Sequence, residues 1–108
     1  MNSRIEKIKT ILDENKGENI EAFDLTGSGY IADYVVLATG LGDRHNEALL
    51  NYLKGGLKPA EEFLHTDISD GWVVVDLGDI VIHIMTESYR EKYQLEKFLT
   101  EFQESRGE

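Results

Sequence analysis

The sequence predicts an α/β fold: a single compact domain, residues 1–108, with a mixed β-sheet flanked by helices in the order α-β-β-α-(β)-β-β-α. Two observations predict it. Apolar residues recur at helical spacing near both ends of the chain, and between these ends they alternate or run together as in strands. A length of 108 residues, 41% of them apolar, is enough for one hydrophobic core.

The first forty residues predict a helix and two strands. Ser3-Arg4-Ile5-Glu6 has the form of a capping box, with Ser3 at the cap, and isoleucines then recur at helical spacing. The helix is expected over 4–15. Alternation over 20–25 predicts a strand, and the β-branched run over 31–39 predicts a second strand, deep in the sheet.

Gly40-Leu41-Gly42 ends this strand and precedes a second helix, for which Asp43 is the expected N-cap. The helix is expected to end at Gly55-Gly56. The stretch that follows is less regular, and a short strand near 63–67 is left open. Towards the C-terminus, Ser88-Tyr89-Arg90-Glu91 repeats the capping-box form, and apolar residues at helical spacing then predict one last helix.

The clearest pattern lies between Trp72 and Met85. Gly78-Asp79 fits a two-residue hairpin turn with Leu77 opposite Ile80. Because side chains alternate along a strand, this pairing fixes which residues share a face. One face is entirely apolar and is therefore the predicted core face: Val73, Val75, Leu77, Ile80, Ile82 and Ile84.

The other face of the hairpin is chemically mixed. It carries an aromatic ring, three apolar side chains, a carboxylate and an imidazole, contributed by Trp72, Val74, Asp76, Val81, His83 and Met85. An aromatic anchor ringed by polar groups is typical of protein–protein hot spots, so this face predicts a recognition surface. The opposite interpretation, a helix that covers the face and buries the tryptophan, stays open.

Charge narrows the class of partner. The formal net charge is −10, which argues against a protein that grips DNA or RNA phosphates. The acidity is segregated, since the stretches Gly17–Asp43 and Pro59–Tyr89 contain acidic residues but no Lys or Arg. A basic partner would be steered towards these stretches. The alternative is that the acidity serves only solubility.

Catalytic and metal-binding patterns are weak. There is no cysteine, no Asp-x-Asp pair and no G-x-S-x-G motif. Gly40-x-Gly42 lacks the third glycine of a dinucleotide fingerprint, which would stand at His45. The histidines His45, His65 and His83 lie too far apart for a zinc-binding pair. The sequence therefore predicts no cofactor, no metal and no enzyme.

The chain also lacks an apolar run long enough to cross a bilayer and an apolar signal-peptide core near Met1. We therefore expect a cytoplasmic protein with no membrane partner.

Several segments together resemble the ribosomal silencing factor family, also called Iojap-like proteins. The resemblance covers roughly residues 5–102. It is carried, in this order, by Ile31-Ala32-Asp33-Tyr34, Ala38-Thr39-Gly40, Asp43-Arg44-His45, Trp72 with Asp76, Gly78-Asp79, Val81 and His83, and then Arg90-Glu91, Tyr93 and Leu95-Glu96.

This resemblance implies a role without catalysis. Proteins of the family bind the fourteenth protein of the large ribosomal subunit, on the face that meets the small subunit, and so block subunit joining when nutrients are scarce. The implied fold is distantly similar to nucleotidyltransferases without their metal-binding carboxylates. Dimers are known among the relatives.

The two lines of reasoning give one hypothesis for the contacts. Asp76 and Asp79 pair with Lys or Arg of the ribosomal protein. The remaining predicted contact residues supply an apolar centre and a rim: Trp72, Val74, Val81 and Met85 at the centre, His83 and Tyr93 at the rim.

Arg44 and His45 have two interpretations, a contact with rRNA or another partner and a structural role in which Arg44 bridges to Asp33 or Asp43. The structural role is favoured. Two other functions stay open for the whole chain, a metal-dependent nucleotidyl- or phosphoester-transfer enzyme and a homodimeric adaptor that uses the mixed face for self-association.

Overall fold

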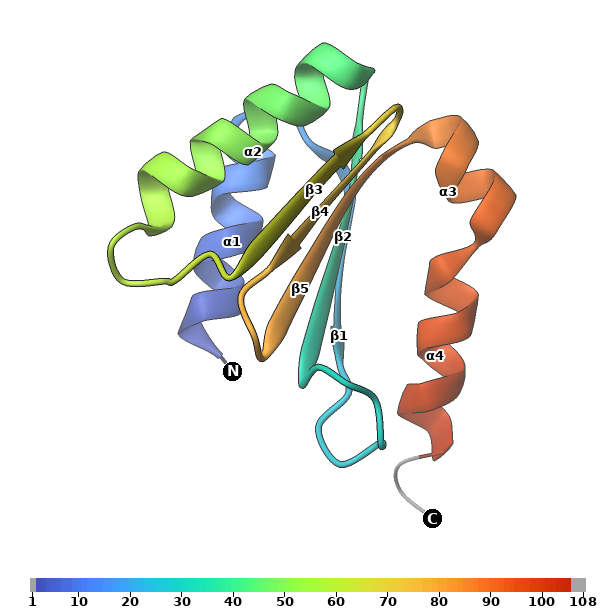
Figure 1. Ribbon diagram of the computed structural model, residues 1–108. Helices are drawn as coiled ribbons and strands as arrows, with labels where there is room; N and C mark the ends of the chain where they lie inside the picture. The colour runs from blue at the N-terminus through green and yellow to red at the C-terminus, as the bar shows by residue number, and fades with distance from the viewer. Residues whose placement is uncertain (1, 106–108) are drawn as a thin grey trace.

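The computed structural model describes residues 2–105. Within them the chain forms one five-stranded sheet between two pairs of helices (Figure 1). The elements, in chain order, are α1 (Ser3–Glu14), β1 (Glu18–Asp24), β2 (Tyr34–Gly40), α2 (Asp43–Leu57), β3 (His65–Ser69), β4 (Trp72–Asp76), β5 (Ile80–Thr86), α3 (Glu87–Tyr93) and α4 (Leu95–Ser105).

The sheet is mixed, as the sequence predicts. Its strand order is β1-β2-β5-β4-β3, and β2 and β5 run parallel while the other neighbouring pairs are antiparallel. The strand left open near 63–67 exists and is β3, at the edge of the sheet, although it begins two residues later.

The predicted hairpin register is confirmed. Trp72 lies opposite Met85 and Val74 opposite His83, and the Leu77 amide donates a hydrogen bond to the Ile80 carbonyl (2.9 Å). Gly78 has a φ of +97°, in the left-handed region that this turn position favours in glycine. All six residues of the predicted core face are buried.

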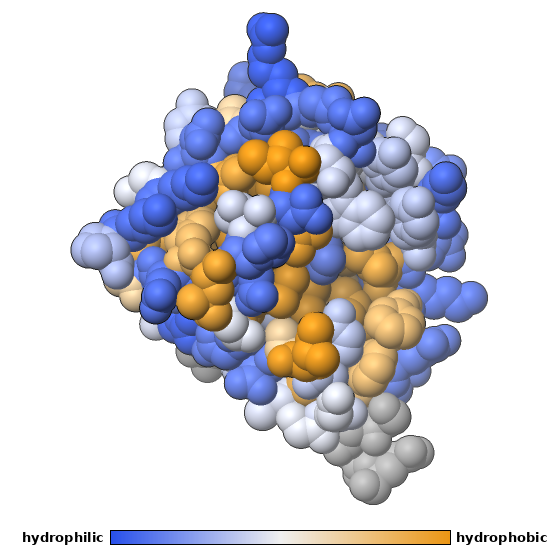
Figure 2. All heavy atoms as spheres, viewed as in Figure 1, coloured by the Kyte–Doolittle hydropathy of each residue, from blue (hydrophilic) through white to orange (hydrophobic). Residues whose placement is uncertain are grey.

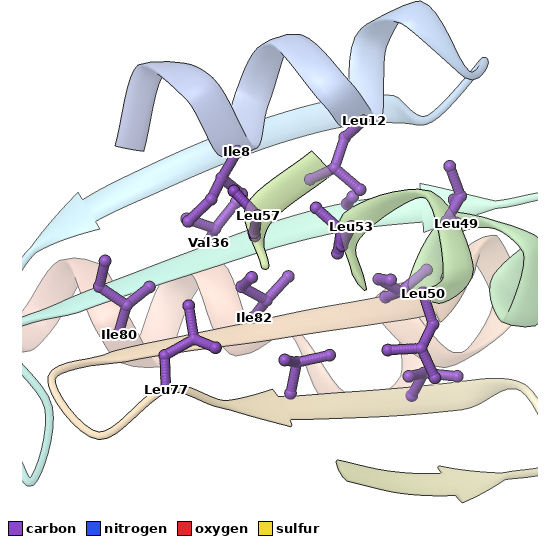
Figure 3. Close-up of a cluster of buried hydrophobic side chains, with 14 of the residues drawn as sticks. Ile8, Leu12, Val36, Leu49, Leu50, Leu53, Leu57, Leu77, Ile80 and Ile82 are labelled. Carbon is purple, nitrogen blue, oxygen red and sulfur yellow. The ribbon is translucent and has the colours of Figure 1, made fainter. Parts of the chain in front are cut away.

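Helices α1 and α2 pack against that core face (Figure 3). Every third or fourth residue of each helix points at the sheet, as expected for amphipathic helices. The central buried side chains are Ile8 and Leu12 of α1, Leu49, Leu50, Leu53 and Leu57 of α2, and Val36, Val75, Ile82 and Ile84 of the sheet.

The second face is covered only in part. Leu99 of α4 packs against a separate cluster formed by Phe23 and Leu25 of the β1 segment and Val35 and Leu37 of β2. Helix α3 lies at the carboxyl end of β5, so most of β4 and β3 has no helix over it on this side (Figure 1). In the same view, apolar side chains reach the surface between the sheet and α4 (Figure 2).

Three predicted helix starts are wrong by one or two residues. The N-cap of α1 is Asn2, whose side chain accepts hydrogen bonds from the Arg4 and Ile5 amides, so Ser3 is already helical. The N-cap of α2 is Gly42, and Asp43 is its first residue. Helix α3 begins directly after β5, with Thr86 at its N-cap, so no capping box forms at Ser88.

The predicted single C-terminal helix is in fact two helices. Gln94 adopts a left-handed conformation (φ 48°, ψ 50°) between α3 and α4. The break changes the direction of the chain, so that α3 covers the end of β5 and α4 runs along β1 and β2 (Figure 1).

The predicted second strand begins later than expected. The Asp33 and Tyr34 amides both donate to the Asp79 carbonyl, which ties the start of β2 to the hairpin turn. Ile31 precedes this anchor and is 89% exposed.

Candidate functional site

The predicted recognition surface lies on the half of the sheet that the helices leave uncovered. Trp72 and Val74 of β4 and Val81 and His83 of β5 are each half-buried there. We call this surface, together with Tyr89 and Tyr93 of α3, the outer hairpin face.

An aromatic cluster forms one end of the outer hairpin face. The Trp72 ring centroid lies 5.1 Å from that of Tyr93 and 6.3 Å from that of Tyr89. The two tyrosine rings, one turn apart on α3, stack at 5.8 Å with an interplanar angle of 18°. Tyr93 remains 47% exposed, so a large apolar edge of the cluster faces solvent.

His83 is held neutral beneath this cluster. The Trp72 Nε1–H donates to His83 Nδ1 at 3.0 Å, which places the histidine proton on Nε2. Burial lowers the pKa of His83 to about 4, because the charged imidazolium loses its hydration there. At neutral pH, His83 therefore contributes an uncharged ring to the face.

Met85 is not part of the accessible surface. Its alternation with His83 places it on this side of the sheet, as predicted, but α3 packs over the end of β5 and Met85 is completely buried. Met85 therefore has no exposed atoms to offer a partner in this arrangement.

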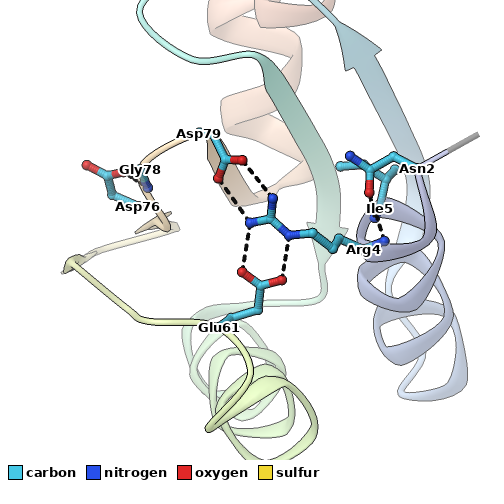
Figure 4. A network of polar contacts seen from close by, with 7 residues as sticks. All are labelled: Asn2, Arg4, Ile5, Glu61, Asp76, Gly78 and Asp79. Carbon is cyan, nitrogen blue, oxygen red and sulfur yellow. Dashed lines mark hydrogen bonds and ion pairs between the residues drawn. The ribbon is translucent and has the colours of Figure 1, made fainter.

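Asp79 points away from the outer hairpin face. Its carboxylate pairs with Arg4 of α1 (Nη1 to Oδ2, 2.6 Å), and the same guanidinium pairs with Glu61 (Nε to Oε2, 2.7 Å) (Figure 4). The hydrogen bonds from Arg4 hold the pKa of Asp79 below its usual value, and Glu61 and Asp79 raise the pKa of Arg4. Asp79 is therefore already paired within the chain, and its pairing with a partner stays a prediction.

Asp76 is available at the surface. It lies opposite Val81, and one of its oxygens accepts a hydrogen bond from the Gly78 amide at 2.8 Å (Figure 4). The register of β3 adds a second carboxylate, Asp67, which lies opposite Val74 and is exposed. Sequence reasoning missed Asp67 because the pairing of β3 with β4 has no signature comparable to the Gly78 turn.

Tyr89 was also missed. Its only sequence signal is its spacing of four from Tyr93, which places both rings on one side of a helix.

Arg44 and His45, two further residues that carry the resemblance, differ in their surroundings. His45 is structural, as favoured, since its Nδ1 accepts from the Leu41 amide and its Nε2 lies 2.9 Å from the Asn15 carbonyl oxygen. Arg44 is exposed, and the predicted bridge to Asp33 or Asp43 is absent among residues 2–105.

Arg90 is the buried charge that sequence reasoning did not anticipate. Its guanidinium donates to Glu21 of β1 (2.9 Å), Glu96 of α4 (2.7 Å) and the Thr39 hydroxyl of β2 (3.0 Å). A groove of about 690 Å³ opens beside this cluster. Arg90 thereby fixes α3 and α4 to the sheet edge, which keeps the tyrosines of α3 next to Trp72.

The described part of the chain contains no group of three or more His, Cys, Asp or Glu side chains arranged to hold a metal ion. None of its helices combines the length and apolarity that crossing a membrane requires. What the outer hairpin face does combine is aromatic rings, aliphatic side chains, an uncharged histidine and carboxylates at the margin. This combination is typical of a protein-recognition domain.

Comparison with known proteins gives the family. A family model described as "Ribosomal silencing factor during starvation" matches residues 1–107. The chain belongs to the ribosomal silencing factor family. The predicted resemblance is thus confirmed, and the protein has a ribosome-associated role in silencing translation.

Individual relatives agree with this assignment. The chain is 37% identical to ribosomal silencing factor RsfS of Haemophilus influenzae, over 86% of this chain and 94% of the relative. It is 32% identical to RsfS of Bacillus subtilis, over 79% and 75% of the two chains. A mouse protein named "Mitochondrial assembly of ribosomal large subunit protein 1" is 30% identical, over 89% of this chain and 45% of the relative.

The fold is also found in solved structures. A crystal structure of a Chromobacterium violaceum protein superposes on this chain with a TM-score of 0.83 at 28% identity. The superposition covers 93% of this chain and 88% of the Chromobacterium violaceum chain.

Proposed function

We propose that this protein silences translation by binding the fourteenth protein of the large ribosomal subunit through the outer hairpin face, and that the bound protein sterically blocks joining of the small subunit, chiefly under nutrient limitation. The observation that carries the proposal is the half of the sheet face left without a helix, in a chain of the ribosomal silencing factor family.

The apolar side chains of this half-face support a protein partner. Trp72, Val74 and Val81 are half-buried in the free protein, and a partner that covers them removes further apolar surface from water. Tyr93 extends the same surface onto α3 and is 47% exposed. Large aromatic side chains at the centre of an interface commonly contribute most of its binding energy.

The charge around this surface supports a basic partner. Asp67 and Asp76 border the outer hairpin face, and the whole stretch Pro59–Tyr89 lacks Lys and Arg. Ribosomal proteins are typically basic, so the two surfaces attract each other before they touch. Charges at an interface rim mainly raise the association rate, whereas buried anchors slow dissociation.

A steric mechanism requires no catalytic group. The outer hairpin face contains a histidine with a pKa of about 4, which is uncharged at neutral pH and suits burial against a partner rather than proton transfer. Blocking depends only on occupancy of the site where the small subunit would dock.

Co-sedimentation with purified large ribosomal subunits tests binding. Trp72→Ala is expected to raise the dissociation constant about 30-fold or more, because a truncated aromatic anchor costs about 2 kcal/mol. Asp76→Lys should slow association, and the effect should shrink as salt is added. The matched control is Tyr52→Ala, which removes an aromatic ring that is 54% exposed on α2, on the other side of the sheet. Equal loss in both aromatic variants, or none in Trp72→Ala, would place the site elsewhere.

Cross-linking identifies the partner protein. The chain has no cysteine, so Val74→Cys creates a unique thiol for a short photoreactive cross-linker on the outer hairpin face. On large subunits, the expected product joins this thiol to the fourteenth protein, whereas Tyr52→Cys does not yield it. A product with another ribosomal protein would contradict the proposed partner, and a product with a second copy would favour the dimeric adaptor.

Subunit joining tests the final step. Large and small subunits mixed in magnesium and separated on a sucrose gradient should form fewer complete ribosomes when wild-type protein is present. When Trp72→Ala replaces the wild type, the amount of complete ribosomes should return to the level seen without the protein. Tight binding of the wild type without any change in joining would refute the blocking mechanism.

A further inference from the structure

The turn between β3 and β4 is held from two sides of the molecule. The Gly71 amide donates a hydrogen bond to Oδ1 of Asp43, the first residue of α2. The Gly71 carbonyl accepts a hydrogen bond from the Thr86 amide (2.9 Å), at the N-cap of α3. Both backbone groups of Gly71 are thus bonded to residues that begin helices on opposite faces of the sheet.

This position accepts only glycine. Gly71 has a φ of +75°, in the left-handed region, and a Cβ built on it would lie 2.3 Å from Cε2 of Tyr89. The Tyr89 ring therefore rests directly on the backbone of the turn. Tyr89 and Trp72, the residue that follows Gly71 in the chain, therefore both adjoin this turn.

Asp43 is placed to prevent such movement. Its carboxylate does not cap its own helix, since the N-cap is Gly42 and α2 has no side-chain capping bond. Instead it reaches a residue 28 positions later in the chain. A hydrogen bond from a backbone amide to a charged carboxylate is about twice as strong as one between neutral groups.

We infer that Asp43 is a positioning residue for ribosome recognition: through Gly71 it holds Trp72 and Tyr89 in the arrangement that the outer hairpin face presents. The inference rests on the proposed function for its biological meaning, but the positioning itself is a property of the free protein. Asp43 lies at the first turn of α2 and its carboxylate accepts the hydrogen bond of Gly71, so its effect on binding passes through the β3–β4 turn.

Three variants separate the hydrogen bond from the charge. Asp43→Ala removes the acceptor, and Asp43→Asn keeps a carbonyl oxygen at the same place without the charge. Glu47→Ala is the matched control, since it removes an exposed carboxylate from the same end of α2. Trp72 is the sole tryptophan, so its fluorescence reports the outer hairpin face without interference.

In the free protein, Asp43→Ala should shift Trp72 emission to longer wavelength and speed hydrogen exchange of the Gly71 amide about tenfold or more. Asp43→Asn keeps the weaker, uncharged acceptor and should lie between Asp43→Ala and the wild type, whereas Glu47→Ala should stay close to the wild type. On large ribosomal subunits, Asp43→Ala should bind about tenfold more weakly, and Asp43→Asn should restore part of the binding.

The outcomes separate the two proposals. Unchanged Trp72 fluorescence and unchanged exchange of the Gly71 amide in Asp43→Ala would overturn the positioning role. A changed Trp72 environment with undiminished ribosome binding would overturn its role in recognition. If wild-type protein does not bind large subunits at all, the proposed function fails, while the fluorescence and exchange results still decide whether Asp43 positions Trp72.

Discussion

The two faces of the central sheet differ in what covers them, although the same hairpin supplies both. On one face, Val75 and Ile82 are completely buried under α1 and α2. On the other, their neighbours Val74 and Val81 are only half-buried, because α4 lies over β1 and β2 instead. If the outer hairpin face is the recognition surface, as proposed, then alternation along one strand separates stability from recognition at a spacing of a single residue.

Neighbouring substitutions on β4 give the sharpest test of this separation. Val75→Lys buries an unpaired charge in the core and should cost more than about 4 kcal/mol of the free energy of unfolding. Val74→Lys places the same side chain beside Asp67 at the surface and should change stability by less than about 1 kcal/mol. Urea unfolding measures both.

For ribosome binding, measured per folded molecule, Val74→Lys should lose more affinity than Val75→Lys. The reason is that only Val74→Lys puts a positive charge where a basic partner docks. If Val74→Lys destabilises the protein as much as Val75→Lys does, the outer hairpin face is part of the core and the distinction fails.

On the partly covered face of the sheet, Arg90 is expected to hold α3 and α4 in place. Arg90→Met keeps the length of the side chain but leaves Glu21, Glu96 and the Thr39 hydroxyl without their donor. The Arg90 side chain is only 9% exposed, so the loss should be about 3 kcal/mol in urea unfolding. Hydrogen exchange should accelerate first in α4. Lys97→Met, which removes an exposed charge from the same helix, should cost less than about 0.5 kcal/mol, and an equal cost would contradict a clamp at Arg90.

The sequence predicted the hairpin side of this comparison well, for a physical reason. A two-residue turn at Gly78 fixes the pairing, and a period of two then assigns every side chain to a face. The same local rules could not reveal that Gln94, a residue without a helix-breaking signature, adopts a left-handed conformation and brings α3 over Met85.

The ion pairs between residues far apart in the chain could not be predicted from the sequence, for a different reason. Arg90 meets Glu21 across 69 positions, and Asp79 meets Arg4 across 75, in a chain with many acidic residues to choose from. Only the packing of α1 and α3 on the sheet decides which carboxylate each arginine finds. For the candidate site, sequence therefore predicted Trp72, Val74 and Val81 on one face, but not that Asp79 is already paired.

His83 should make the outer hairpin face sensitive to acid. Its pKa is about 4 when folded and about 6.5 when unfolded, so below pH 6.5 the unfolded state binds the extra proton and stability falls as the pH falls towards 4. Between pH 7 and pH 5 this amounts to roughly 2 kcal/mol. His83→Gln keeps an acceptor for the Trp72 indole and should lack this part of the pH dependence in urea unfolding. If stability falls equally with pH in the wild type and in His83→Gln, folding does not lower the pKa of His83 and the prediction is wrong.

The smallest expected effect distinguishes the two carboxylates of the hairpin turn. Asp79 lies 44% exposed in its pair with Arg4, so Asp79→Asn should cost only about 0.5 kcal/mol at pH 7. Because Arg4 lowers the folded-state pKa of Asp79, this contribution is complete above the unfolded value of 3.8 and is lost as the pH falls through the folded value. The stability difference between wild type and Asp79→Asn should therefore vanish in acid. Ribosome association should stay unchanged in Asp79→Asn and slow several-fold in Asp76→Asn, since of these two carboxylates only Asp76 borders the outer hairpin face. Equal slowing in both would mean that the partner reaches around the turn to Arg4 and that the boundary between the stabilising and the recognising surface lies beyond Gly78.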